Sequence, residues 1–429
     1  MDISIRIGIW LELAESCGLS VIQQGLQQIW RLLLLCLICR VSFRLDVPST
    51  LKHGVSVLTG ICGLFLFFEL DMVWVLLLAG LCYFILLLSQ NPSRRGLYLS
   101  VVILSYLLIG ELLLVDMVTW HKIRGSQMVV AMKAISVAFD VDRGAVGRLP
   151  SLPEYLGYVL FVGTVVFGPW ISFSTYMNAS SFYSVKKSQL CLLVSSCIAP
   201  YLFPLFVPIQ GNQFTQKWQR AYENALSFHF SNYFVGHLSE STTMLAGAGF
   251  SEEKDNILWD LKVVEPLNVE MPRSMVQVVT SWNIPMSQWL KTYVFKNAMK
   301  LGTFPAILVT YTASALLHGL SFHLGAVLLS LGFITYVEHV LRKKLSAIFN
   351  ACILSRPCTS DCSHRHKKVF HCCSKPHCSI FSWSLYSTWS GFKGFKLSYT
   401  AIHTIQRWSE LNWASHWIVF LCWLLFLIL

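Results

Sequence analysis

Charge is scarce in this sequence. Of its 429 residues, only 13% are charged and 55% are hydrophobic, which leaves too little polar surface for a soluble globular protein of this size. We therefore expect a protein embedded in a lipid bilayer. The net charge of +11 gathers in connecting segments such as 122–148 and 342–344, which the positive-inside rule places in the cytosol. No basic stripe interleaved with aromatic residues marks a soluble domain, so no nucleic-acid partner is expected.

Several catalytic signatures are absent as well. None of the 13 histidines is followed by glutamate, so the HExxH motif of zinc proteases is missing, and so is GxSxG. His318 and His323 are five residues apart and point to different faces of a helix. The apolar segments therefore supply too few ligands for a di-iron or zinc centre, and we expect no metal in the active site.

An ion-coupled transporter is a weaker possibility. Such transporters carry pairs of short, interrupted helices in matching halves of the chain, and the sequence shows no such pair. The acidic residues available to such a protein are Glu69, Asp71 and Glu111, which lie in or beside apolar segments. We favour interfacial placement of these residues, or their pairing with Arg and Lys, over ion transport.

The apolar segments predict an all-α polytopic membrane protein, with about 8–11 transmembrane or re-entrant helices around an internal tunnel. No repeat of fixed period divides the chain, so 1–429 is treated as a single domain. Pro200, Pro204 and Pro208 would line one face of a kinked helix beside such a tunnel, although a helix end at the headgroups fits nearly as well. The clearer segments are 30–41, 55–68, 72–88, 97–115, 155–173, 190–209, 303–341 (as two spans or one broken one) and 413–429.

Two other segments interrupt the spanning pattern. Residues 116–150 are expected either to lie in the membrane interface or to form a solvated charged loop. Residues 249–300 are too polar to span and suggest a re-entrant element or a short helical subdomain. The first residues lack the basic start and small-residue cleavage site of a signal peptide, so no cleavable signal is expected, and the first apolar helix would target the chain to the endoplasmic reticulum.

His318 interrupts the apolar segment 303–341. An ionisable side chain at membrane depth needs a reason. Burial disfavours the charged imidazolium, so the ring is expected to be neutral and able to accept a proton, as a general base must. The alternative is that His318 makes a structural hydrogen bond between helices.

Asn283 lies upstream of His318, in Ser281-Trp282-Asn283-Ile284-Pro285. It offers both a carbonyl acceptor and an amide donor, although by itself such a residue is more often a turn former. A lone intramembrane histidine with an upstream asparagine and no metal partner suits acyl transfer from an activated thioester.

Cysteine and histidine are dense in 358–378, which holds Cys358, Cys362 and His364 among others. No pair of C-x2-C knuckles at separated positions occurs there, so the spacing resembles no standard zinc finger. A reduced or lipid-modified cytosolic loop is favoured, and zinc binding remains the alternative.

The contexts of Asn283 and His318 resemble the membrane-bound O-acyltransferase superfamily, within it the branch that acylates Wnt proteins. The resemblance covers most of 20–366 and again about 404–429. The matching segments are 118–122 (VTWHK), 167–173 (FGPWISF), 220–223 (RAYE), 227–234 (SFHFSNYF), 245–250 (LAGAGF), 281–283 (SWN), 314–319 (SALLHG) and 407–411 (RWSEL).

This resemblance implies a multi-pass enzyme of the endoplasmic reticulum membrane. It would take a cis-monounsaturated sixteen-carbon acyl group from palmitoleoyl-CoA, its co-substrate, and esterify a serine of Wnt proteins in the lumen, without a cofactor. By position, His318 is the catalytic base and Asn283 its partner. Trp282, Tyr311 and Ser314 would line the substrate site, with ordinary helix packing as the alternative.

One segment departs from the family. Residues 367–401 read as a divergent loop of Cys, His, Ser, Trp and Phe that replaces an expected spanning segment. If a span is lost there, the last helix either inverts or fails to insert. The rival function for the whole chain is a non-catalytic membrane protein that binds or carries lipid or Wnt.

Overall fold

The computed structural model describes residues 20–89, 94–177, 213–248, 251–253, 256–258, 261–319, 322–356, 358, 362, 364 and 408–429. Its contacts divide the chain into two compact units. Unit 1 comprises Met1–Leu190, Phe234–Val263 and Leu316–Leu320, and unit 2 comprises Cys191–Tyr233, Val264–Ala315 and Ser321–Leu429. Each unit is described by itself.

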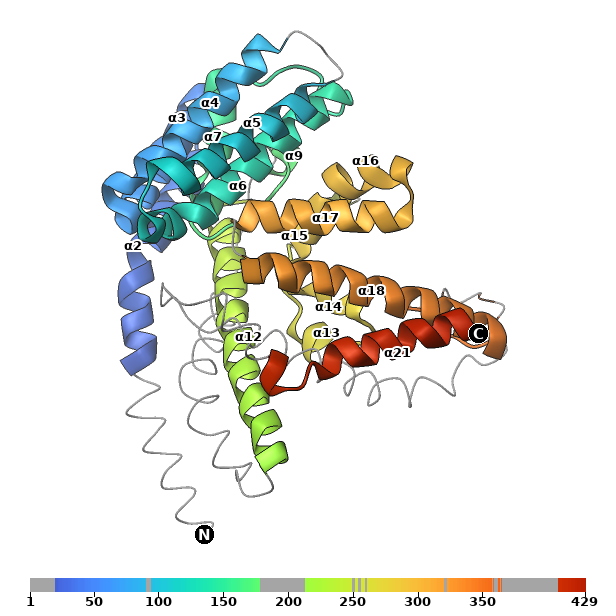
Figure 1. Cartoon of the computed structure of the whole chain (residues 1–429). Coiled ribbons are helices and arrows are strands. Elements are labelled where there is room, and N and C mark those ends of the chain that lie inside the picture. Colours follow the sequence, from blue (N-terminus) through green and yellow to red (C-terminus); the bar gives the residue numbers. More distant parts are fainter. Residues whose placement is uncertain are drawn as a thin grey trace. The chain divides into compact units, whose positions relative to one another are not determined.

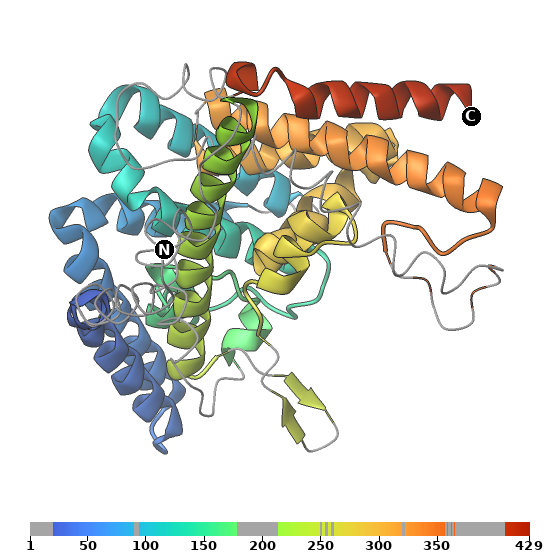
Figure 2. The ribbon, with the colours of Figure 1, turned by 90° about the horizontal axis from the view of Figure 1, so that it is seen from below.

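Unit 1 is built of apolar helices (Figure 1). They are α2 (Ser20–Arg44), α3 (Ser49–Phe68), the 3-10 turn η2 (Glu69–Asp71), α4 (Met72–Leu88), α5 (Arg95–Ile109), the π-helical turn η3 (Gly110–Leu114), α6 (Met117–Asp142), α7 (Leu152–Val159), α8 (Val162–Val165) and α9 (Phe173–Met177). The end of α12 (Gln213–Leu245) and a two-stranded antiparallel hairpin, β1 (Ser251–Glu253) and β2 (Asn256–Leu258), complete it. Figure 2 shows the hairpin as two short arrows.

Helix α4 shows how these helices suit a bilayer. Val75, Leu78 and Cys82 are buried and recur at helical spacing on one face, while Leu77 and Phe84 on other faces are exposed. A helix that is apolar all round buries one face against protein and offers the other to lipid.

Helix α6 forms the core of unit 1 and lies beside α5 (Figure 1). Asp116 caps its N-terminus by accepting hydrogen bonds from the backbone N–H groups of Val118 and Thr119 at 3.1 and 3.4 Å. Lys133 is fully buried in it and donates to the carbonyl of Tyr158 at 2.7 Å. The expectation of an interfacial stretch or a solvated loop over 116–150 is therefore wrong for 117–142, because most of this helix is buried and its Arg124 and Lys133 side chains donate to internal carbonyls.

The predicted span 155–173 is also wrong. Three short helices, α7, α8 and α9, occupy that part of the chain. Gly168 adopts a φ of +81° and Pro169 follows it without an N–H group, so a continuous helix is impossible there. Tyr158 donates its hydroxyl to the carbonyl of Ile171 at 2.6 Å, which folds the segment back on itself inside unit 1.

Unit 2 holds the second half of the chain. Its helices are the first part of α12, α13 (Pro266–Glu270), α14 (Met275–Trp282), α15 (Ile284–Trp289), the π-helical turn η5 (Leu290–Phe295), α16 (Lys296–Ala298), the 3-10 turn η6 (Met299–Leu301), α17 (Thr303–His318) up to Ala315, α18 (Phe322–Phe349) and α21 (Ala414–Ile428). Helices α18 and α21 lie side by side in both views (Figures 1 and 2). Lys344 joins their C-terminal ends by donating to the carbonyl of Phe426 at 3.0 Å.

The fold class predicted from the sequence is confirmed: the described chain is helical apart from one small hairpin, and it contains four candidate membrane spans. These are Gln23–Arg44, Ser49–Leu88, Arg95–Leu114 and Leu324–Phe349, with Thr303–His318 and Ala414–Ile428 as shorter apolar helices. The short helices of 266–301 fit the helical subdomain expected in 249–300, and the segment 303–341 is two helices. The total number of spans and the tunnel remain predictions. Segments 190–209 and 367–401, and with them the three prolines, lie outside the described residues.

Candidate active site

His318 is the last residue of α17. Gly319 follows it with a φ of +119°, a left-handed conformation that ends helices and that glycine adopts without a Cβ penalty. The N–H of Gly319 donates to the carbonyl of Leu316 at 3.3 Å and closes the last turn. Leu317 and Gly319 are buried, whereas His318 is exposed. The side chain of His318 thus keeps solvent-accessible surface at the end of the helix.

Arg124 of α6 holds the turn that carries His318. Its Nη2 donates to the carbonyl of Leu316 at 2.8 Å, and its Nε donates to the carbonyl of Leu317 at 3.1 Å. Helix C-termini leave such carbonyls without partners inside the helix, and a cation there also suits the helix dipole. Arg124 thus fixes the backbone on which the imidazole is mounted.

Glu111 of η3 holds Arg124 in turn. Its Oε2 accepts from Nη1 of Arg124 at 2.8 Å, and each side chain is only 8% exposed. A Cβ added to Gly319 would lie 3.1 Å from Oε1 of Glu111, so this carboxylate packs closely against the residue after His318. We call Glu111 and Arg124 the Arg124 clamp. A π-helical turn such as η3 often marks a functional site.

The acidic residues weighed for ion transport are thereby accounted for. Glu111 pairs with Arg124, and Asp71 lies 3.6 Å from Nζ of Lys122 in a partly exposed pair. Glu69 is exposed at the turn between α3 and α4. Glu111 and Asp71 thus show the preferred prediction of pairing, and the interfacial placement of Glu69 stays a prediction.

Asn283 lies in unit 2 between α14 and α15, and it caps α15. Its Oδ1 accepts from the backbone N–H of Met286 at 3.0 Å. Asn283 is thus a turn former in the structure, which was the alternative to a catalytic role. The same bond fixes the amide orientation, because an N–H donor requires the oxygen. The Nδ2 group makes no hydrogen bond to any other described residue, so two donors of the half-buried side chain remain available.

Trp282 precedes Asn283 and lies in an aromatic cluster with α12. Its ring stacks on Phe228 at 5.9 Å and 21°, and it meets the edge of His229 at 5.2 Å and 75°. Tyr233 contacts the same ring system at 6.0 Å. In the sequence, these α12 residues stand out only because the segment 227–234 matches the family, and no role could be assigned to them.

Glu270 of α13 ties this cluster together. One oxygen, Oε1, accepts from the hydroxyl of Tyr233 at 2.6 Å and lies 3.0 Å from Nδ1 of His229. His229 is fully buried. The hydrogen bonds hold two of the rings against Trp282, so the backbone that leads into Asn283 is braced from α12 and α13. No motif spacing in the sequence marks Glu270.

Tyr311 and Ser314 lie on one face of α17 in unit 2. A Cβ added to Gly332 of α18 would lie 2.9 Å from the ring of Tyr311, and the hydroxyl of Tyr311 is 3.5 Å from that of Thr335. Ser314 is buried. Tyr311 therefore packs α17 against α18, which is the alternative given for it above, and the assignment of either residue to a substrate wall stays a prediction.

These features define a helical membrane protein in which one unit presents a histidine at a braced helix end and the other an asparagine amide beside a buttressed tryptophan. A model of the membrane-bound O-acyltransferase family matches residues 61–350, which is more than half of the chain. The chain belongs to this family and is an acyltransferase.

Individual proteins similar to this chain show which kind of acyltransferase it resembles. The protein-serine O-palmitoleoyltransferase porcupine of Mus musculus is 54% identical over 447 residues, covering 97% of each chain. The porcupine of Homo sapiens is 53% identical over 453 residues, again with 97% of each chain covered. The porcupine of Anopheles gambiae is 37% identical over 364 residues, covering 75% of this chain and 72% of the mosquito protein. The family inferred from the sequence is confirmed, and so is its palmitoleoyltransferase branch.

Proposed function

We propose that this protein transfers a palmitoleoyl group from palmitoleoyl-CoA to a serine hydroxyl of Wnt proteins, at the membrane of the endoplasmic reticulum. The observation that carries the proposal is the 54% identity over 97% of the chain to a protein-serine O-palmitoleoyltransferase. The serine acceptor and the acyl group come from that relative's name. Wnt as the acceptor and the endoplasmic reticulum as the compartment rest on the sequence resemblance.

The mechanism assigned to His318 is general-base catalysis. Its ring takes the proton from the serine oxygen as that oxygen attacks the thioester carbonyl. The tetrahedral intermediate collapses by breaking the carbon–sulfur bond, and the thiolate of coenzyme A leaves with the proton returned by the imidazolium. The products are the serine ester and free coenzyme A, with no acyl-enzyme. An exposed ring on a braced backbone suits a base that must reach an incoming substrate.

Asn283 has the complementary role. Its Oδ1 is used in the helix cap, so Nδ2 is the group that can donate to a substrate. Donors of this kind stabilise the oxyanion of a tetrahedral intermediate or hold the acceptor hydroxyl. The brace on Trp282 keeps the amide from swinging, which matters because catalytic donors act through preorganisation.

The test is direct acylation by the purified protein. A disulfide-bonded Wnt hairpin peptide and palmitoleoyl-CoA are incubated with the protein, and mass spectrometry of the peptide reports the ester. We expect wild type to yield peptide heavier by one acyl group, and His318→Ala to lose about 10²- to 10⁴-fold in turnover. Acyl-CoA binding by His318→Ala serves as the control for folding.

Two outcomes would contradict the proposal. If wild type binds both substrates but forms no ester, the protein is a carrier and not a transferase. If His318→Ala retains the wild-type rate, the base is another group. A peptide with its serine replaced by alanine controls for acylation at other sites.

A further inference from the structure

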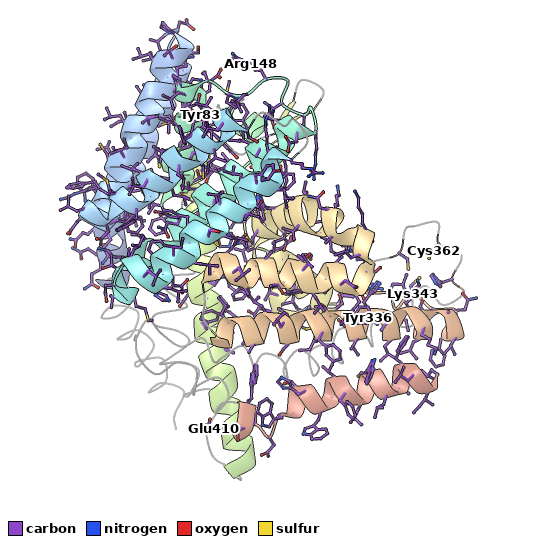
Figure 3. The ribbon with its side chains drawn as sticks, turned by 45° about the horizontal axis from the view of Figure 1, so that its top comes forward. Tyr83, Arg148, Tyr336, Lys343, Cys362 and Glu410 are labelled. Atoms are coloured by element: carbon purple, nitrogen blue, oxygen red, sulfur yellow. The ribbon has the colours of Figure 1, made fainter. Side chains whose placement is uncertain are left out.

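A compact group of sulfur and nitrogen atoms lies beyond the C-terminal end of α18 in unit 2. It consists of Cys352, Cys358, Cys362 and His364, whose ligand atoms all lie within 4.8 Å of one another. Figure 3 labels Cys362 near that end of the helix. The group is remote in sequence from His318 and Asn283, and the proposed acyl transfer makes no use of it.

The distances suit a tetrahedral zinc ion. Sγ of Cys352 lies 3.3 Å from Sγ of Cys362 and 3.7 Å from Nδ1 of His364, and Sγ of Cys358 lies 3.8 Å from the same nitrogen. Zinc–sulfur bonds of about 2.3 Å and zinc–nitrogen bonds of about 2.0 Å give tetrahedral edges of about 3.8 and 3.5 Å. The three distances given lie within about 0.5 Å of those edges, and no pair of the four ligand atoms is more than 4.8 Å apart.

The sulfurs are not a disulfide. None of Cys352, Cys358 and Cys362 forms a disulfide, and 3.3 Å is far longer than a sulfur–sulfur bond of about 2.05 Å. Three thiols this close repel one another when ionised, so a cation at their centre is the natural way to hold them together as thiolates.

Ser346 fixes the ring of His364 in the tautomer that a metal needs. Its single hydroxyl proton goes to the carbonyl of Ala351 at 2.7 Å, so its oxygen must accept from Nε2 of His364 at 3.2 Å. Nε2 then carries the ring proton, and Nδ1 presents a lone pair to the sulfurs. Metal-binding histidines are oriented in this way by a partner on their other nitrogen.

The backbone of the first ligand is anchored independently of any metal. Arg273 donates to the carbonyl of Cys352 at 2.6 Å and to that of Leu354 at 3.0 Å. Arg342 of α18 donates to the carbonyl of Ile353 at 3.1 Å. These guanidinium groups hold 352–354 against unit 2, and their positive charge also favours a site with three thiolates.

We propose that Cys352, Cys358, Cys362 and His364 bind one structural zinc ion. All four positions are filled by protein, which is the closed arrangement of structural sites and leaves none for a substrate. Thiolate-rich tetrahedral sites favour zinc over magnesium, calcium and manganese. The ion ties Cys358, Cys362 and His364 to the end of α18. The adjoining basic residues Arg342, Lys343 and Lys344 are those expected in the cytosol, where thiols stay reduced.

The first test is the metal content of the purified full-length protein. After gel filtration in detergent without added metal, elemental analysis by mass spectrometry should give about one zinc per chain. X-ray absorption at the zinc edge should then give three sulfurs and one nitrogen around the ion. Wild type free of zinc, or zinc in a shell of oxygen and nitrogen, overturns the proposal without any variant.

Variants then assign the ligands. The double substitution of Cys358→Ser and Cys362→Ser should reduce zinc at least tenfold, and His364→Ala should leave a weaker site that loses zinc to a chelator. Cys62→Ser, at an exposed free cysteine of α3, is the matched control and should retain the full content.

The other cysteines of the segment 358–378 provide the outcome that would contradict the proposal. Cys372, Cys373 and Cys378 are replaced together by serine, and zinc should remain. If zinc is lost in this triple variant but kept in the double variant, the ligands are different and the proposal is wrong. If a variant does not express as a monodisperse protein, the absorption spectrum of wild type still decides the question.

Discussion

The Arg124 clamp leads to the most specific prediction about catalysis. Arg124→Ala removes two charge-assisted hydrogen bonds to the last carbonyls of α17 and the ion pair with Glu111. Breaking a buried ion pair by removing one partner costs about 3–5 kcal/mol, much of it because the other charge stays buried. Releasing the helix end also displaces the ring of His318, and a misplacement of about 1 Å can cost about 10²-fold in rate.

Stability and catalysis can be separated by a second variant. Replacing Glu111 by Leu and Arg124 by Met together removes both buried charges, and such apolar replacements of buried pairs are often neutral for stability. The carbonyls of Leu316 and Leu317 nevertheless lose the hydrogen bonds from the guanidinium group. We therefore expect the double variant to melt near wild type but to keep a turnover about 10²-fold lower. Arg124→Lys retains the positive charge but not the several N–H donors of the guanidinium group. Its turnover should lie between those of wild type and Arg124→Ala.

The assay is steady-state acylation of the hairpin peptide, with thermal melting of each variant in detergent. A positioning role lowers kcat while the KM for palmitoleoyl-CoA stays within about twofold, because binding and chemistry are affected differently. Arg148→Ala is the control, since its ion pair with Glu154 is 75% exposed on the arginine side and should matter by less than about 1 kcal/mol. The reasoning is refuted if the Leu/Met double variant folds normally and turns over at the wild-type rate.

The other predictions concern the neighbours of the two site residues. Asn283→Ala should lower kcat by about 10²-fold, as loss of a single oxyanion donor does, and unaltered acylation would reduce the residue to a helix cap. Gly319→Ala places a Cβ at a φ of +119° and 3.1 Å from Glu111. It should cost about 1–3 kcal/mol, measured as a lower melting temperature, and an unchanged melting curve would contradict the tight packing of that turn. Glu270→Ala leaves the hydroxyl of Tyr233 without its acceptor and should destabilise the protein by about 1–3 kcal/mol. Because the chain has 15 tryptophans, the emission of Trp282 is read as the difference from Trp282→Phe. This difference spectrum should shift as the brace loosens, and a difference spectrum and stability equal to wild type would show that the brace is dispensable.

Helices that face lipid could be predicted well from the sequence. The segment 72–88 coincides with α4 and 55–68 falls within α3, because a helix in contact with hydrocarbon must be continuously apolar and hydrogen-bonded within itself. The segment 97–115 was also close, although its end is π-helical rather than α-helical. Glu111 lies in this π-helical turn and pairs with Arg124, and hydropathy does not predict the change from α-helix to π-helix.

Segments buried inside the protein could not be predicted in the same way. The segment 155–173 is as apolar as a span, yet it is folded around Pro169 and packed within unit 1. Conversely, α6 carries Arg124 and Lys133 and looked too polar for an interior helix, but both side chains donate to backbone carbonyls of neighbouring segments. Hydropathy measures the free energy of moving a side chain out of water, but it does not include the hydrogen-bond partners that offset this cost inside the protein. For this reason it predicts a span at 155–173 where there is none, and it misses the buried helix α6.

The candidate site was only partly visible for a related reason. His318 and Asn283 stand out because an ionisable group in an apolar segment and an amide before Ile-Pro are local features. The groups that position them, Arg124, Glu111 and Glu270, are separated from them by many residues and are recognised only once the chain is folded. Residue type identified the proposed base, but the fold was required to explain how its backbone is held.

Residue spacing alone does not reveal the four proposed zinc ligands as a set. In the sequence, the dense cluster begins at Cys358, and without C-x2-C pairs it favoured a reduced or lipid-modified loop. The structure adds Cys352, which lies directly after the end of α18 and is held there by Arg273. The resulting order is C-x5-C-x3-C-x-H over Cys352, Cys358, Cys362 and His364, which contains no C-x2-C pair. The proposed ligands need no standard spacing, because a helix end and two arginines already position the first of them.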